Sequence, residues 1–173
     1  MTIVVKRIKP KRLKEDAMRL ALLNPMRDFG KEIKKEFEET TKTWDHKVNF
    51  EILRSISSKW GTVEVAVLTD DEIYGYVNEG TRPHIIRPKK RGGKLVFKWG
   101  GPGSYAAKTT PGVIGSTSGG QSGSTVAFPY VNHPGTKARN FSKIIKKKME
   151  PRFKKKMEKA MAAAAIASGH AIK

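Results

Sequence analysis

The chain has 173 residues, of which 35 are lysine or arginine and 16 are aspartate or glutamate, so its formal net charge is +19. The length suits a single domain with a modest core. It contains no cysteine, which excludes disulfides, thiolate metal sites and cysteine catalysis. No apolar run approaches the roughly 20 residues that cross a bilayer, so we expect a soluble intracellular protein without a membrane partner. A charge of this size indicates an acidic partner, such as nucleic acid or an acidic protein surface.

The N-terminal third is predicted to be helical. Residues 1–12 should form a basic arm, and one α+β domain is expected over residues 13–168. A weak helix over residues 13–21 should end at Asn24, because proline disfavours the helical conformation of the residue before it. A stronger helix should begin there, with Asn24 as N-cap and Pro25 in its first turn. Its apolar stripe recurs every three, four or seven residues, at Met26, Phe29, Ile33, Phe37 and Trp44.

Two alternating apolar segments follow this helix. They read VNFEI from Val48 and TVEVAVL from Thr62, and they predict a hairpin packed against the helix, with its turn at SSKWG. The next segment, DDEIYGYV, permits two structures. Its aspartates could cap a short helical turn, but the two-residue spacing of Tyr74 and Tyr76 suits a strand equally well.

The second half of the chain is predicted to hold the remaining strands and a long insertion. A second hairpin is expected with its bend at residues 91–93, Ile86 on one arm, and Leu95 and Phe97 on the other. Residues 100–125 are mostly glycine, serine, threonine and proline, which cannot bury enough apolar surface to offset the cost of ordering. We therefore expect a flexible insertion between two strands.

A basic helix packed on the sheet should close the domain. Its apolar residues recur every four positions from Phe141, and lysines occupy most positions between them. Pro151 should kink this helix or restart it at its own position. Ser168 and Gly169 should end it, leaving residues 169–173 as a tail. Five of its cationic residues are candidates for contact with phosphate or an acidic partner: Lys143, Lys146, Lys147, Arg152 and Lys155. The predicted class is thus α+β.

The sequence offers little for catalysis. No two of its four histidines have the three- or four-residue spacing that places two ligands on one helix face, and no carboxylate cluster accompanies them. The serines crowd into the predicted flexible insertion, where a nucleophile could not be held in place. The segment GGPGSYAAK lacks the Lys-Ser/Thr ending of a P-loop. We predict no catalytic residue, no metal and no cofactor. No sequence-specific nucleic-acid motif is present either, which leaves nonspecific phosphate contact open.

Two further segments are alike in composition. YVNEGTRPHIIRPK begins at Tyr76 and HPGTKARNF begins at His133; each contains Gly-Thr beside a basic residue and a His-Pro or Pro-His pair. Together and in this order they resemble a family of tailed bacteriophages, the minor tail components, also described as neck or head–tail joining proteins. This sequence departs from the family at Asn140, where a proline is common, and in its longer glycine-rich insertion. The matching positions are Tyr76, Glu79, Gly80, Thr81, Arg82, Pro83, His84, Pro88, His133, Pro134, Gly135, Thr136, Lys137, Ala138, Arg139 and Phe141.

The resemblance implies a structural virion protein rather than an enzyme. It implies a homo-oligomeric ring, assembled in the host cytoplasm, that joins the portal or connector of the capsid to the tail. Its partners would be its own copies, the connector or adaptor, head-closure and tail proteins, and genomic DNA in the lumen as a nonspecific contact. A tail terminator and a nonspecific DNA-binding protein remain as alternatives, and both segments could also merely shape turns within one chain. The implied interface residues are Tyr76, Glu79, Thr81, Arg82, His84, His133, Thr136, Lys137, Arg139 and Phe141.

Overall fold

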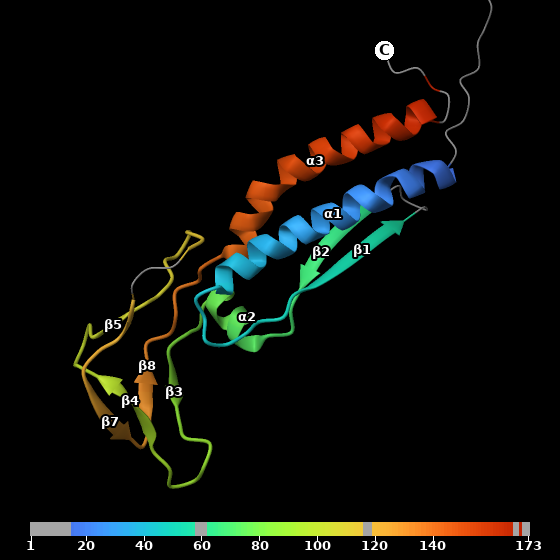
Figure 1. Ribbon diagram of the computed structural model, residues 1–173. Coiled ribbons are helices and arrows are strands. Elements are labelled where there is room, and N and C mark those ends of the chain that lie inside the picture. Colours follow the sequence, from blue (N-terminus) through green and yellow to red (C-terminus); the bar gives the residue numbers. More distant parts are fainter. Residues whose placement is uncertain (1–14, 58–61, 116–118, 168–169, 171–173) are drawn as a thin grey trace, which may run out of the picture.

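The computed structural model describes residues 15–57, 62–115, 119–167 and 170 (Figure 1). The predicted arm at residues 1–12, most of the first hairpin turn and most of the C-terminal tail lie outside these ranges. The fold is α+β, as predicted. Its helices are α1 (Glu15–Thr41), α2 (Glu72–Glu79) and α3 (Phe141–Ala167). Its strands are β1 (Glu51–Ser57), β2 (Thr62–Leu68), β3 (His84–Ile86), β4 (Leu95–Trp99), β5 (Tyr105–Ala106), β6 (Gly120–Gln121), β7 (Ser124–Phe128) and β8 (Val131–His133).

Helix α1 runs without interruption through Pro25, so the predicted break at Asn24 is wrong. A proline inside a helix removes one backbone hydrogen bond and costs about 3 kcal/mol. Here Leu22 and Met26, on either side of the proline, are buried in one cluster with Met157 of α3. Burying a large apolar side chain contributes about 1.5–3 kcal/mol. Packing on both sides of Pro25 therefore offsets the loss and keeps the helix continuous.

The first hairpin is confirmed, but its first strand begins only at Glu51, so Val48 and Phe50 of the predicted arm lie before it. β1 and β2 are antiparallel, with Ile52 opposite Val67, and α1 packs on the hairpin and against α3 (Figure 1). The segment DDEIYGYV adopts the helical alternative and forms α2. The Asp71 side chain accepts a hydrogen bond from the backbone N–H of Tyr74 and so caps this helix. Tyr74 is buried and meets the ring of Phe50 edge-on at 5.1 Å. This aromatic contact joins α2 to the segment just before β1 in the core.

The other strands form three separate antiparallel pairs, β3 with β8, β4 with β7 and β5 with β6. The predicted second hairpin, between β3 and β4, is therefore wrong. A bend does occur there, and Gly92 has a φ of 76°. The strands on its two sides nevertheless pair with different partners, because alternation along a strand identifies a face but not a neighbour. Figure 1 shows these ribbons at one end of the molecule, beyond the start of α3.

The glycine-rich insertion does lie between two paired strands, β4 and β7. Its described part is attached to the rest of the chain at several points. Ile114 packs against the buried clusters that contain Phe29 and Phe50, and the N–H of Gly112 donates to the carbonyl of Arg139 at 3.2 Å. Composition gave no sign of these contacts, because they depend on single residues within a polar segment.

Helix α3 is continuous through Pro151, so the predicted restart at this residue does not occur. Figure 1 shows the first turns of α3 at an angle to the rest, as expected when a proline ring clashes with the carbonyl of the preceding turn. The buried stripe includes Phe141, Ile145 and Met149, as predicted. None of the helices in the described part of the chain is long and apolar enough to span a membrane.

Candidate functional site

The two segments that carry the family resemblance lie side by side and are joined by backbone hydrogen bonds. We call residues 77–84 and 133–142 the clamp. Thr81 and Thr136 face one another as an antiparallel bridge. The N–H of Thr81 donates to the carbonyl of Thr136 at 2.9 Å, and the N–H of Thr136 donates back at 3.1 Å. The Thr81 hydroxyl also accepts from the N–H of Thr136 at 3.0 Å. Two segments 55 residues apart thus form one hydrogen-bonded unit.

The glycine before each threonine makes this approach possible. Gly80 has φ 81° and ψ 170°, a region that is essentially restricted to glycine, and Gly135 has a φ of 87°. A Cβ on Gly80 would lie 2.6 Å from the carbonyl oxygen of Thr136, and a Cβ on Gly135 would lie 2.3 Å from that of Thr81. Each glycine therefore makes room for the backbone of the opposite segment, which explains why both segments contain Gly-Thr.

The clamp continues into the start of α3. The N–H groups of Arg139 and Asn140 donate to the carbonyls of Val77 and Asn78 at 3.1 and 2.9 Å. The Asn78 side chain then accepts from the N–H of Ser142 at 3.1 Å, in the first turn of the helix. No sequence signal marked Asn78, because its partner is 64 residues away.

Asn140 shows what the departure from the family pattern does. Its φ is 56°, in the left-handed region that asparagine tolerates better than most residues. Proline cannot adopt this φ, since its ring holds φ near −65°, and it has no N–H to donate to Asn78. This chain therefore begins α3 with a backbone geometry that a proline at position 140 would exclude.

The clamp also brings two histidines together. His84 and His133 are directly opposite across β3 and β8, with ring centroids 5.1 Å apart. Nδ1 of His84 donates to the carbonyl of Arg82 at 2.8 Å. Nδ1 of His133 instead accepts from the N–H of Gly135 at 3.1 Å, so this nitrogen carries no proton. Their sequence spacing gave no indication of this pairing.

The structure divides the predicted interface residues into two groups. Phe141 has 0% and Arg139 has 7% of its surface exposed, so neither can contact another subunit in this conformation. For these two residues the prediction is corrected. Phe141 lies in the core, and the Arg139 guanidinium donates to the Thr109 hydroxyl and to the Lys137 carbonyl at 2.9 and 2.8 Å. Thr81, His133 and Thr136 are partly buried in the clamp. The exposed members of the set are Tyr76, Glu79, Arg82, His84 and Lys137.

The predicted cationic residues of α3 also fall into two groups, those paired with a carboxylate of α1 and those without an ion pair in the described ranges. Arg152 forms an ion pair with Glu32 of α1 at 3.2 Å, so its charge already has a partner within the chain, and its contact with phosphate or an acidic partner stays a prediction. Neighbouring cations of α3 are paired in the same way, because Lys156 pairs with Glu32 and Lys148 pairs with Glu36. Four of the predicted residues are exposed and lie within 4 Å of no carboxylate in the described ranges: Lys143, Lys146, Lys147 and Lys155.

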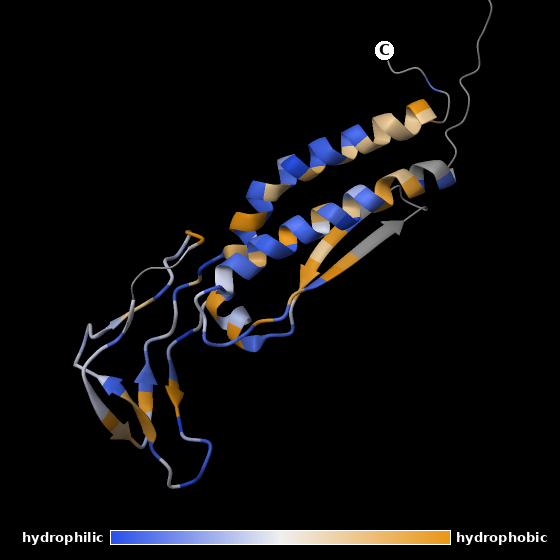
Figure 2. Cartoon of the chain, viewed as in Figure 1, coloured by the Kyte–Doolittle hydropathy of each residue, from blue (hydrophilic) through white to orange (hydrophobic). Residues whose placement is uncertain are grey.

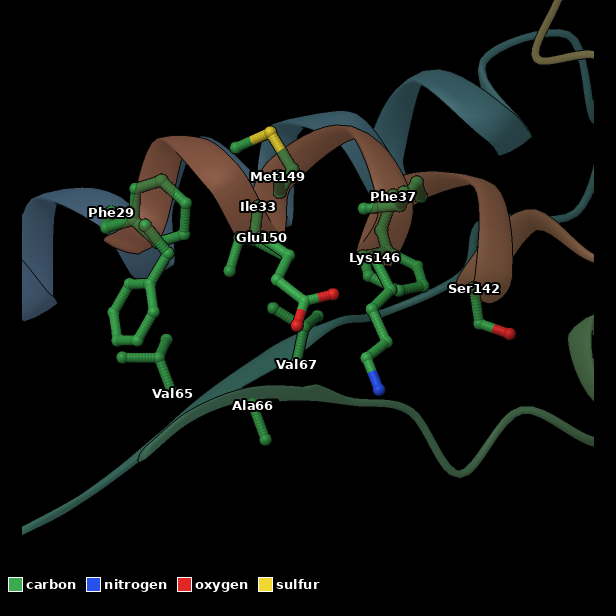
Figure 3. Close-up of a pocket in the computed structure, with 12 residues that line it drawn as sticks. Phe29, Ile33, Phe37, Val65, Ala66, Val67, Ser142, Lys146, Met149 and Glu150 are labelled. Atoms are coloured by element: carbon green, nitrogen blue, oxygen red, sulfur yellow. The ribbon is translucent and has the colours of Figure 1, made fainter. Parts of the chain in front are cut away.

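Lys146 occupies a different environment, at a cleft where α1, α3 and β2 meet. The cleft has a volume of about 370 Å³ and is lined mainly by apolar side chains such as Phe29 and Val67. Figure 3 shows Lys146 and Glu150 pointing from α3 toward β2 across its opening. Ser142 is the other polar residue of the lining, and its hydroxyl is hydrogen-bonded to the Asn78 side chain at 3.1 and 3.3 Å.

Among the described residues, two titratable groups have shifted pKa values. The hydrogen bond from His46, followed by that from the N–H of Tyr74, lowers the pKa of Asp71 below its usual 3.8. Burial raises the pKa of the Tyr74 phenol, which stays neutral in the core. Both groups lie at the start of α2, Asp71 as its N-cap and Tyr74 in its first turn. No group of three or more His, Asp or Glu residues suited to a metal occurs in the part of the chain that the structure describes.

The chain matches no protein-family model, no curated protein and no solved structure. The clamp is thus the feature from which a function has to be argued.

Proposed function

We propose that this chain is a structural subunit of the head–tail connection of a tailed bacteriophage, and that it works as a homo-oligomeric ring. The proposal rests on the two segments by which the sequence resembles the neck and minor tail proteins. What supports it most is that the clamp combines both segments into one hydrogen-bonded element, with Glu79 and Arg82 exposed within it and Tyr76 exposed just before it. Rigid surface elements suit a subunit that must dock identically in every copy of a ring.

Open strand edges also support assembly. The sheets of the described residues are all two-stranded, and an open strand edge presents backbone N–H and C=O groups that a partner subunit can cover.

The experiment is to measure the mass of the purified full-length protein by light scattering and to image it by negative-stain electron microscopy. We expect ring-shaped particles, either alone or after addition of phage connector or tail proteins. Arg82→Glu, which reverses an exposed charge of the clamp, should weaken assembly. Lys35→Glu reverses an exposed charge on α1 and serves as the matched control. A chain that stays monomeric with these partners and is missing from purified virions would rule the proposal out.

A nonspecific DNA-binding protein is the second candidate, and the net charge of +19 favours it. The two candidates differ in what they require. The first requires self-association with or without DNA, whereas the second requires DNA affinity in a chain that need not self-associate.

A further inference from the structure

Positive charge is distributed very unevenly along the chain. Between residues 28 and 79 there are 12 acidic residues and 7 lysines or arginines, whereas between residues 81 and 140 there are 10 lysines or arginines and no acidic residue. The second segment contains all the ribbons from β3 to β8. The acidic residues of this protein therefore lie on the helices, the first hairpin and the connections next to them, and the charged residues of the ribbon end are all cations.

The structure gathers six of these cations on and around one turn. The connection between β3 and β4 carries five of them, and Lys98 lies on β4. Figure 2 shows this connection as a mainly hydrophilic loop at the tip of the ribbon end. None of the six forms an ion pair with a carboxylate anywhere in the described ranges. The six residues are Arg87, Lys89, Lys90, Arg91, Lys94 and Lys98.

Helix α3 is the other strongly basic part of the chain, but carboxylates lie among its cations. Lys148, Arg152 and Lys156 face Glu32 and Glu36 on α1, and Glu150 and Glu158 belong to α3 itself. Its other cations are exposed and form no ion pair in the described ranges: Lys143, Lys146, Lys147, Lys154, Lys155 and Lys159. The β3–β4 connection has no carboxylate at all, and like charges this close together repel each other at low salt. An external polyanion would therefore relieve more repulsion at the connection than on α3.

Aromatic side chains accompany the cations. Arg87 lies over the ring of Tyr130, 5.8 Å from its centroid, and Tyr130, Trp99 and Phe128 are each at least 40% exposed. Lysine is depleted in protein–protein interfaces, whereas nucleic-acid interfaces are strongly positive and use aromatic rings for stacking. A lysine-rich surface with exposed rings and no acidic residue therefore fits nucleic acid better than an acidic protein.

We infer that the ribbon end, around the β3–β4 connection, is a nonspecific binding surface for the phosphate backbone of nucleic acid, and that α3 is not the main contact. This inference does not depend on the proposed ring, because it concerns the affinity of a surface within one chain. In a ring it would identify the part of the subunit that faces the DNA. Duplex and single-stranded DNA share the phosphate chemistry, and the exposed rings could add stacking only with unpaired bases.

The test compares two triple variants that remove equal charge. The first is Lys89→Gln/Lys90→Gln/Arg91→Gln in the connection, and the second is Lys143→Gln/Lys147→Gln/Lys155→Gln on α3. All six side chains are exposed, so both variants should fold, and circular dichroism melts check this. Affinity for a 20-bp duplex, a 20-nucleotide oligo-dT and poly-glutamate is measured by fluorescence anisotropy between about 50 and 200 mM salt, the range over which phosphate contacts weaken strongly.

Each lost duplex phosphate contact lowers the slope of log affinity against log salt by about 0.9. The connection variant should therefore show a duplex slope shallower by about 2.7, or about 2.1 on oligo-dT. The α3 variant should change either slope by less than half as much.

Three outcomes would overturn the inference. The first is wild-type protein that binds neither DNA at about 0.1 M salt, a concentration at which a surface of several phosphate contacts still binds. The second is an α3 variant that loses as much slope as the connection variant. The third is poly-glutamate bound as tightly as DNA, which would indicate an acidic protein partner. Ring formation is scored separately by imaging, so failure here leaves the proposed function standing.

Discussion

Gly135→Ala tests whether the clamp depends on a side-chain-free approach of two backbones. At a φ of 87° an alanine costs about 1–2 kcal/mol. Its Cβ would also lie 2.3 Å from the carbonyl oxygen of Thr81. Since that oxygen belongs to the backbone, the two segments must separate. Separation weakens the reciprocal Thr81–Thr136 hydrogen bonds, worth about 1 kcal/mol each. We expect a total loss of about 3–4 kcal/mol in the free energy of unfolding.

Gly92→Ala provides the matched control. Gly92 has a φ of 76°, but a Cβ there would meet nothing within 4 Å. The free energy of unfolding of this variant should fall only by the conformational cost of about 1–2 kcal/mol. Both substitutions reduce the entropy of the unfolded chain equally, so that effect cancels in the comparison. The difference of about 2 kcal/mol should therefore report the steric contact alone.

Equilibrium urea unfolding, followed by circular dichroism, measures the difference. With a slope near 2 kcal/mol per molar urea, the midpoint of Gly135→Ala should fall about 1 M below that of Gly92→Ala. If the two midpoints agree to within about 0.3 M, which corresponds to about 0.6 kcal/mol, the clamp does not depend on close backbone approach.

Two further predictions concern the insertion and the cap of α2. Arg139→Met removes the bonds to Thr109 and Lys137 and should cost about 2 kcal/mol. Limited proteolysis should then cut residues 100–115 faster, whereas exposed Lys137→Met should leave the cutting rate unchanged. The lowered pKa of Asp71 means that its stabilisation is present above the unfolded pKa and is lost as pH falls through the folded pKa, below 3.8. Stability of the wild type should therefore fall more steeply on acidification than that of Asp71→Asn; parallel profiles in pH-dependent urea unfolding would contradict the role of this cap.

Local pattern was sufficient for the elements whose partners are close in sequence. The apolar stripe of α1, the first hairpin and the buried stripe of α3 follow from periods of 3.6 and 2. The pattern failed at Pro25, where the helix does not end, and at Pro151 only the predicted restart does not occur. Local propensity at each proline favours an end or a restart, but the packing of α1 against α3 supplies buried contacts on both sides.

The candidate site was predictable only in part. Composition and motif singled out the two Gly-Thr segments, yet nothing in either segment states that Thr81 pairs with Thr136. The sequence also could not show which cations of α3 form ion pairs, because the carboxylates that pair with Arg152 and Lys148 lie more than 100 residues away, on α1. Residues that looked like a free surface in the sequence, such as Arg139 and Phe141, are buried once the chain folds.

By itself, then, the sequence determined the apolar stripes of α1 and α3, the pairing of the first hairpin and the excess of cations, because these depend on neighbours close in sequence. The tertiary structure alone decided how the later strands pair, which cations are neutralised and which motif residues stay on the surface. Those outcomes depend on contacts between distant residues, such as Thr81 with Thr136, 55 positions apart, and Glu32 with Arg152, 120 positions apart. Such long-range contacts depend on the burial and hydrogen bonding of the whole chain, so they cannot be predicted from any short segment.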